Sequence, residues 1–299
     1  MTDLLTKYLE YLSYEKKYSQ LTVSAYKADI NQFIAFCNDN YEVNQPEEFH
    51  VNFLRAWIAS LSNDNIQVTS INRKISSVKG FYRFLLETNT LLDSDFVEYS
   101  HIKSSKKQEI PFSKAEINAA LNQIEDLNFE GARNKLIIEF IYTTGVRRAE
   151  LINLKIQDIS LDTKTCRVTG KRNKQRIIPL IDELIDTLRN YLKFRDAIPT
   201  DNNYLLITKK GTKVYNSLIY RTVMSCFQNI TTKHKKSPHI LRHSFATHML
   251  EENADINSIK KILGHESLAA TQHYMKSDLS MLKKVYKASH PRSKSRDEG

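Results

Sequence analysis

Hydrophobic residues recur at intervals of three and four positions through the first hundred residues, which is the spacing of amphipathic helices. Residues 4–17, 24–37 and 51–61 each carry one such stripe. The clearest stripe runs from Val68 to about Glu87 and contains Val68, Ile71, Ile75, Val78, Tyr82 and Leu85. The pattern therefore predicts that residues 1–100 are helical.

The helix predicted from Val68 to Glu87 also carries a line of polar side chains on its other side, namely Asn72, Ser76, Lys79 and Arg83. A polar line of this kind is most often a solvated helix face. The alternative is a helix face laid against a phosphate backbone. Spacing alone favours the solvated face but does not decide between the two.

A polar and basic stretch, residues 101–112, interrupts the helical pattern and has the composition of an interdomain linker. Beyond it, Ser113 and Glu116 stand at capping-box positions and predict the start of a helix. Residues 132–144 form an apolar helical segment that Gly145 ends as a C-terminal cap.

Two short strands are predicted over residues 166–169 and 176–180, where residues alternate or are β-branched. The basic turn at residues 170–174 joins them, and helical patterns resume from about Ile181. The second part of the chain is thus predicted to be helical apart from these strands.

Composition is consistent with two soluble domains. The chain has 299 residues and a hydrophobic share of 41%, which is enough for two cores. No apolar run approaches the roughly 18 residues of a spanning helix, and the charged N-terminus lacks the features of a signal peptide. Cys37, Cys166 and Cys226 are too few and too distant for a disulfide framework or a zinc site, and fit a reducing compartment. We therefore expect a cytoplasmic protein.

Charge is unevenly divided along the chain. The net charge is +10, yet residues 1–100 contain 9 basic and 13 acidic side chains, for a net −4. The remaining 199 residues contain 35 basic and 21 acidic side chains, for a net +14. A basic segment of this size indicates a polyanionic partner, most commonly nucleic acid.

Arg147 follows Gly145 and begins a new helix, with Glu150 one turn later. An arginine at such a junction can point into a cleft while the carboxylate holds its guanidinium. The simpler interpretation is a surface i, i+3 ion pair worth only about 0.2–0.5 kcal/mol.

The turn at residues 170–174, which includes Lys171, has a simple interpretation as well, since a lysine-rich turn is usually solvated. It can also deliver one ammonium to a phosphate or to a leaving oxygen.

The segment HILRHSFATHML, residues 239–250, is rich in cationic and imidazole side chains. His239 and Arg242 lie on one face of a helix, and His239 and His243 have the i, i+4 spacing of a two-histidine metal site. No glutamate stands between these histidines as in HExxH, and Arg242 would place a fixed positive charge beside a cation. Phosphate therefore fits this segment better than a metal ion.

A helix-ending Gly264 is followed by His265, and Tyr274 lies nine residues further on. His265 and Tyr274 are each weak evidence for a catalytic site when taken alone. A histidine after a helix-ending glycine is usually a cap, and most of the 15 tyrosines are expected to pack or to face solvent. With the arginines and the lysine, they complete the set needed to cut a phosphodiester with a protein nucleophile and no metal. A phenol has a pKa of about 10, so forming phenolate at pH 7 costs roughly 4 kcal/mol. Arginines and histidines would stabilise the transition-state charge, and a lysine would protonate the departing 5′-oxygen.

Arg147, Lys171, HILRH, LGH and Tyr274, in this order and at these intervals, resemble the signature of the tyrosine recombinases, the phage integrase family. The resemblance covers nearly the whole chain and is greatest to the Xer subgroup, which resolves chromosome dimers at cell division. It implies a mainly α-helical fold with a small antiparallel β-sheet, arranged as a C-shaped clamp. The implied domains are a helical, SAM-like core-binding domain over residues 1–100, a linker over 101–112 and a catalytic domain over 113–299.

The resemblance also implies a role for each matched residue. Tyr274 would be the nucleophile that forms a 3′-phosphotyrosyl link, while Arg147 and Arg242 would bind the scissile phosphate. Lys171 would be the general acid for the 5′-oxygen. His239 would assist proton transfer at Tyr274, and the remaining implied phosphate ligand is His265. His243 and His248 would then only pack or brace their helix.

The partners implied by the family are a double-stranded DNA recombination site and a homo- or hetero-tetramer on two such sites. The C-terminal tail after Tyr274 would dock on a neighbouring subunit, and an activating DNA translocase is a further candidate partner. Neither a metal nor a nucleotide cofactor is implied, because the phosphotyrosine stores the bond energy for religation. Our candidate DNA contacts are Lys79, Arg83, Arg172 and Lys174.

Three other functions fit parts of the same pattern. An integrase or invertase of a mobile or phase-variable element shares the chemistry. A type IB topoisomerase uses a similar set of residues without assembling a tetramer. A DNA-binding accessory protein that cuts nothing would need only the basic surface.

Overall fold

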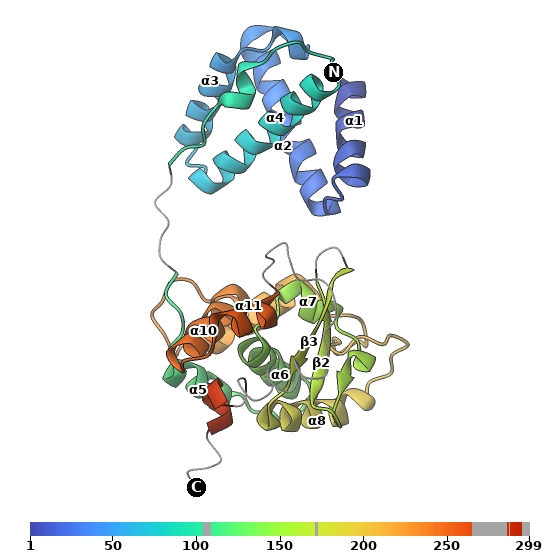
Figure 1. Cartoon of the computed structure of the whole chain (residues 1–299), viewed down its shortest axis with the longest axis vertical. Helices are drawn as coiled ribbons and strands as arrows, with labels where there is room; N and C mark the ends of the chain where they lie inside the picture. Colours follow the sequence, from blue (N-terminus) through green and yellow to red (C-terminus); the bar gives the residue numbers. More distant parts are fainter. Residues whose placement is uncertain (104–108, 171–172, 265–285, 287, 295–299) are drawn as a thin grey trace. The chain divides into compact units, whose positions relative to one another are not determined.

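The computed structural model describes residues 1–103, 109–170, 173–264, 286 and 288–294. The chain divides into two compact units, which we call the N-terminal unit (Met1–Lys107) and the C-terminal unit (Gln108–Gly299). Helices dominate both units, and the C-terminal unit adds a three-stranded antiparallel sheet (Figure 1). The predicted fold class, mainly α-helical with a small antiparallel sheet, is confirmed.

The N-terminal unit is a bundle of helices around one hydrophobic core. Its elements are α1 (Thr2–Glu10) with a π-helical turn η1 (Tyr11–Glu15), α2 (Gln20–Tyr41), η2 (Pro46–Glu48), α3 (Val51–Asn63), α4 (Val68–Glu87) and η3 (Asp95–Glu98). The stripe predicted for α4 is buried from Ile71 to Leu85 and packs on α2, whereas Val68 at the start of the helix stays partly exposed. Hydrophobic spacing had predicted α1, α2, α3 and α4, whereas the short 3-10 helices η2 and η3 had not been predicted.

The polar line of α4 contacts the chain itself. Asn72 exchanges two hydrogen bonds of 2.9 Å with the backbone of Ile102, and the hydroxyl of Ser76 lies 2.8 Å from the His101 ring. The Lys79 ammonium donates to the Tyr99 carbonyl at 2.5 Å. Three members of the line therefore hold the segment that leads out of the unit, which neither of our two interpretations had anticipated.

Lys79 and Arg83, the two candidate DNA contacts on α4, differ in their accessibility to a ligand. Burial, together with the nearby Arg83 charge, lowers the pKa of Lys79. Arg83 itself is exposed. Of the two candidate DNA contacts on α4, the structure therefore leaves Arg83 accessible to a phosphate and occupies Lys79 with a backbone carbonyl.

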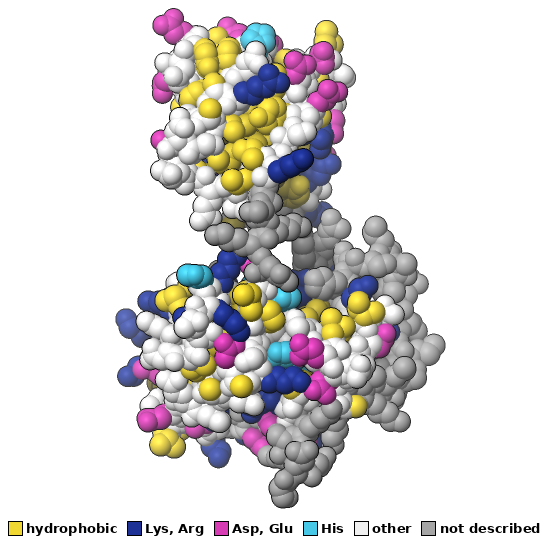
Figure 2. Space-filling view, turned by 90° about the vertical axis from the view of Figure 1, so that its left-hand side faces the viewer, with side chains coloured by type: hydrophobic (Ala, Val, Ile, Leu, Met, Phe, Trp, Pro, Cys, Tyr) yellow, Lys and Arg dark blue, Asp and Glu magenta, His cyan; other side chains and the backbone are white. Residues whose placement is uncertain are grey.

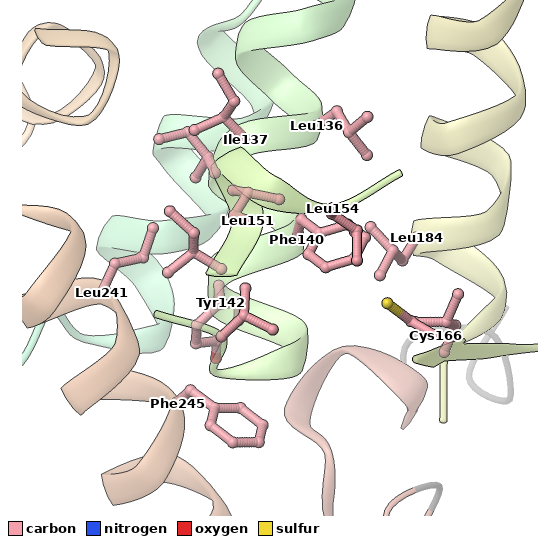
Figure 3. Close-up of a cluster of buried hydrophobic side chains, with 14 of the residues drawn as sticks. Leu136, Ile137, Phe140, Tyr142, Leu151, Leu154, Cys166, Leu184, Leu241 and Phe245 are labelled. Carbon is pink, nitrogen blue, oxygen red and sulfur yellow. The ribbon is translucent and has the colours of Figure 1, made fainter. Parts of the chain in front are cut away.

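The C-terminal unit is built around α6 (Phe129–Thr144), which is buried along nearly its whole length. Figure 3 shows Leu136, Ile137, Phe140 and Tyr142 meeting side chains from the surrounding elements. Those elements include α5 (Lys114–Gln123), α7 (Arg148–Asn153), β2 (Thr165–Thr169), α8 (Asp182–Asp196), α9 (Asn216–Phe227), α10 (Pro238–Glu251) and α11 (Ile256–Leu263), whereas the short helix η4 (Ile156–Asp158) has no buried side chain. The capping box predicted at the start of α5 is present, since Ser113 and Glu116 exchange hydrogen bonds.

The sheet orders its strands β1 (Ile159–Ser160), β2 (Thr165–Thr169) and β3 (Gln175–Pro179), all antiparallel. Cys166 pairs with Ile178 and Val168 pairs with Arg176, and all four side chains are buried on one face. The two longer strands were predicted, whereas the two-residue β1 was not. Lys171 and Arg172 lie outside the described residues.

The described part of the C-terminal tail packs on its own unit. Tyr286 is buried and its hydroxyl donates to the Thr143 carbonyl at the end of α6. Arg292, in the short helix η6 (Pro291–Lys294), forms an ion pair of 2.8 Å with the buried Glu139. These residues have partners within their own unit, and docking of the tail on a neighbouring subunit stays a prediction.

In the ranges that the structure describes, no helix combines the length and the hydropathy needed to cross a bilayer. The three cysteines are free thiols; Cys37 and Cys166 are buried and Cys226 is half-buried.

Candidate active site

Arg147 stands at the junction between α6 and α7. Gly145 ends α6 in the left-handed conformation (φ 61°), and Arg147 then adopts extended backbone as the N-terminal cap of α7. Its backbone N–H donates to Oε2 of Glu150 at 2.8 Å, and its Nη1 donates to Oε1 of the same carboxylate at 3.0 Å. The Glu150 side chain is only 5% exposed, so our simpler interpretation of a surface ion pair is wrong.

The reason for the burial of Glu150 is a second arginine that the sequence did not reveal. Arg176 on β3 donates from Nη1 and Nη2 to the two oxygens of Glu150, at 3.0 and 2.7 Å. Burial alone would raise the pKa of Glu150, but the hydrogen bonds and charges of Arg176 and Arg147 hold it below its usual range. Strand alternation was the available signal, because Arg176 is two residues from the inward-facing Ile178.

Arg242 on α10 extends to the junction between α6 and α7 and to the end of α11. Its Nη1 donates to the Gly145 carbonyl, and its Nη2 donates to the Leu263 carbonyl at 2.8 Å. Burial, reinforced by the charge of Arg147, lowers the pKa of Arg242 to about 10, so the guanidinium stays charged at neutral pH. A desolvated cation beside another cation is a favourable place for an anion.

Three arginines therefore meet at the C-terminal end of α11. Arg176 donates from Nε to the Ile262 carbonyl at 2.7 Å, Arg242 to Leu263, and the Nη2 of Arg147 lies 3.5 Å from the Gly264 carbonyl. These are carbonyls that the helix itself leaves without partners at its negative end. The end of one short helix thus fixes the positions of three cationic groups from three different elements.

Two of these arginines, Arg147 and Arg242, line a cleft of about 620 Å³. The cleft is bounded by residues of α7, α9, α10 and the end of α11, namely Val146, Arg147, Arg148, Ala149, Tyr220, Ser237, Pro238, His239, Arg242, His243, Ala246 and Leu263. Arg147 is 45% exposed there, whereas Arg176 lies in the layer beneath. A cleft with two fixed guanidinium groups and two imidazoles suits a phosphate ester.

The histidines of α10 divide into two groups. His239 is 74% exposed at the cleft, with Nε2 3.4 Å from the Glu109 carboxylate. His243 is also exposed at the cleft, so of the two roles predicted for it, packing is wrong and bracing its helix stays a prediction. His248 is buried, lies 3.0 Å from the Tyr142 hydroxyl, and has its pKa lowered mainly by burial, which confirms a packing role.

Of the other predicted site residues, the structure describes only Lys174. Lys171, Arg172, His265 and Tyr274 lie outside the described residues. Lys174 is described and exposed. Among the residues with a described placement, no group of three or more His, Cys, Asp or Glu side chains could hold a metal ion.

Charged side chains are mixed over the face of the molecule that Figure 2 shows. On the C-terminal unit, Lys and Arg side chains there alternate with acidic, histidine and hydrophobic ones. The excess of basic residues in the second part of the chain is therefore not gathered into one patch on this face.

Comparison with protein families matches both units. The model for the phage integrase family matches residues 110–281, and the model for the phage integrase N-terminal SAM-like domain matches residues 5–89. "Tyrosine recombinase XerC" of Chlorobaculum parvum is 35% identical over 96% of this chain and 94% of that protein. The protein of the same name from Staphylococcus epidermidis is 32% identical over 98% of this chain and 99% of its own length.

Solved structures share the fold. XerH site-specific recombinase, bound to palindromic difH substrate in a post-cleavage complex, matches with a TM-score of 0.71 at 21% identity, covering 91% of this chain and 77% of that chain. A lambda integrase dimer bound to a COC′ core site matches with a TM-score of 0.69 at 15% identity, covering 92% of this chain and 98% of that one.

Proposed function

Because this chain belongs to the phage integrase family, the tyrosine recombinases, we propose that the cleft between α7 and α10 binds the phosphate at which DNA is cut and rejoined. The chain is a site-specific DNA recombinase of the Xer type. The observation that carries the proposal for the cleft is the convergence of Arg147 and Arg242 on the end of α11. Both guanidinium groups are fixed before any substrate arrives.

The chemistry of the site follows from where charge develops. As the Tyr274 oxygen attacks, the phosphorus gains a fifth ligand and its non-bridging oxygens gain negative charge. Arg147 and Arg242 stabilise that charge from fixed positions, and the loss of one such donor typically slows a reaction by about 10²–10³-fold. His265 supplies a further hydrogen bond to the phosphate.

Two proton transfers complete the step. The Tyr274 phenol gives up its proton with the assistance of His239, which is exposed at the cleft. Lys171 protonates the departing 5′-oxygen, so a 5′-hydroxyl leaves as the 3′-phosphotyrosyl bond forms. The reverse attack by a 5′-hydroxyl on the phosphotyrosine rejoins the strands without a nucleotide cofactor, because one phosphodiester is exchanged for another.

We further propose that residues 1–100 form the core-binding domain, that residues 101–112 link it to a catalytic domain over 113–299, and that both domains contact one recombination site. Four subunits, of one or two kinds, would assemble on two sites in the cytoplasm. The curated relatives are named XerC, and the resemblance to the Xer subgroup favours chromosome dimer resolution at cell division over integration of a mobile element. An activating DNA translocase would fit that role.

The experiment that tests this proposal traps the covalent intermediate. DNA attached to the protein in cells is recovered and sequenced to find the site, and a duplex copy is then nicked beside the cleavage point. In EDTA, the wild-type protein should form an SDS-resistant adduct with this duplex. Tyr274→Phe should bind the duplex and form no adduct.

Two results would count against the proposal. Binding by the wild-type protein without an adduct would indicate an accessory protein that cuts nothing. An adduct that persists in Tyr274→Phe would mean that another residue is the nucleophile.

A further inference from the structure

Arg176 occupies a position on β3 at which a charge is unexpected. The side chain faces inward with Ile178 and is buried, at 8% exposure. A buried guanidinium is unfavourable unless its donors and its charge are all matched. Here Nε donates to the Ile262 carbonyl, and the two terminal nitrogens form a bidentate pair with Glu150.

Stability alone does not account for this arrangement. Buried ion pairs are often no more stabilising than hydrophobic residues of similar volume, because desolvation offsets the attraction. Neighbouring positions on the same inward face are held by Cys166, Val168 and Ile178 without any such charge. The Arg176 guanidinium therefore adds fixed geometry to the unit, and the question is which group benefits.

The contacts of Arg176 lead directly to the cleft. The carboxylate that it fixes is the one that holds both the backbone N–H and the guanidinium of Arg147. The helix end that it fixes, at Ile262, is followed by the carbonyls that receive Arg242 and Arg147. Arg176 itself does not line the cleft, so any effect that it has on a bound phosphate passes through these neighbours.

We propose that Arg176 is a positioning residue for DNA cleavage, which rests on the function proposed above. By holding Glu150 and the end of α11 from beneath, it fixes the Arg147 guanidinium in the orientation that meets the scissile phosphate. A guanidinium is needed because its planar fork matches the carboxylate while Nε reaches a third acceptor. An ammonium keeps the charge but cannot make all three contacts.

The test is Arg176→Lys, measured as the single-turnover rate of adduct formation on the nicked duplex. We expect DNA affinity within about twofold of wild type and a cleavage rate lower by about 10–100-fold, as for residues that orient an active-site ligand. Arg195→Lys is the matched control. Arg195 is equally buried, on α8, and donates to the carbonyls of Asn202, Tyr204 and Leu205 away from the cleft. Its substitution should lower thermal stability and leave the cleavage rate of the folded protein unchanged.

A double substitution separates positioning from a general structural role. If Arg176 acts through Arg147, then Arg147→Lys combined with Arg176→Lys should be slowed by much less than the product of the two single effects. Effects that multiply, or an equal slowing in Arg195→Lys, would overturn the inference. An unchanged cleavage rate in Arg176→Lys would overturn it while leaving the proposed function intact. No cleavage by the wild-type protein would overturn the proposed function itself.

Discussion

Replacing Glu150 by Gln should destabilise the C-terminal unit strongly, because it leaves the Arg176 charge buried without a counter-charge. The side chains of Glu150 and Arg176 are 5% and 8% exposed, and removal of one partner of such a pair costs about 3–5 kcal/mol. The second partner, Arg147, is 45% exposed and contributes about 0–1 kcal/mol because water solvates it when unpaired. For a unit of this size, the expected loss corresponds to a melting temperature lower by roughly 6–20 °C.

Glu116→Gln provides a matched control. Glu116 also closes a capping box, through the backbone N–H of Ser113, and also pairs with a cation, Lys233, at 2.6 Å. The flexible Lys233 ammonium is partly exposed and can turn to solvent, so we expect a loss of only about 1 kcal/mol.

Circular dichroism during thermal and urea unfolding measures both losses. Trp57, the one tryptophan of the chain, lies in the core of the N-terminal unit. Its fluorescence therefore identifies the unfolding of that unit and leaves the remaining transition to the C-terminal unit. A Glu150→Gln protein as stable as Glu116→Gln would refute the view that Glu150 neutralises a buried charge.

Further predictions concern the same unit. Lowering the pH should destabilise the wild-type protein, because the pKa of Glu150 is depressed in the folded state. The stabilisation that the ionised Glu150 carboxylate provides is complete above its unfolded pKa of about 4.3. It is lost as the pH falls from there through the lower pKa of the folded state. Urea unfolding between pH 6 and 3 should therefore show a shallower acid decline in Glu150→Gln, and equal declines would contradict this. Gly145→Ala should cost about 2–5 kcal/mol, because the residue has φ 61° and an added Cβ would lie 2.5 Å from the Phe245 ring; a nearly neutral result in the same assay would show that the ring can move. Tyr286→Ala should cost about 3–5 kcal/mol and Tyr286→Phe only about 1 kcal/mol, since the ring is buried and its hydroxyl binds the Thr143 carbonyl; no change in the melting temperature with either variant would mean that the tail leaves its own unit in solution.

Features that depend on neighbouring residues could be predicted from the sequence. The bounds of α4, Val68–Glu87, coincide with the predicted helix because its stripe is continuous over five turns. The start of α5 was predicted from Ser113 and Glu116, whose interaction spans three residues. Gly145 was predicted as a helix end because few other residues adopt its backbone conformation.

Features that depend on distant partners could not be predicted in this way. Strand alternation indicates only that Arg176 faces the same way as Ile178. Its partners could not be predicted, because Glu150 is 26 positions away and Ile262 is 86 positions away. The polar line of α4 suggested a solvated or DNA-binding face because polarity alone does not reveal a returning segment such as Tyr99–Ile102. The candidate arginines of the cleft were predicted from the family resemblance, whereas the shared carboxylate and helix end that fix them required the structure.

The most direct test of the central claim, that Arg147 and Arg242 neutralise the charge of the scissile phosphate, uses a DNA site with a methylphosphonate at that position. Removing one negative oxygen removes the need for a cation there. We predict that Arg242→Ala slows adduct formation on ordinary DNA by about 10²–10³-fold and that most of this defect disappears on the methylphosphonate. An equal defect on both substrates would show that Arg242 supports the fold of the cleft and does not meet the phosphate charge.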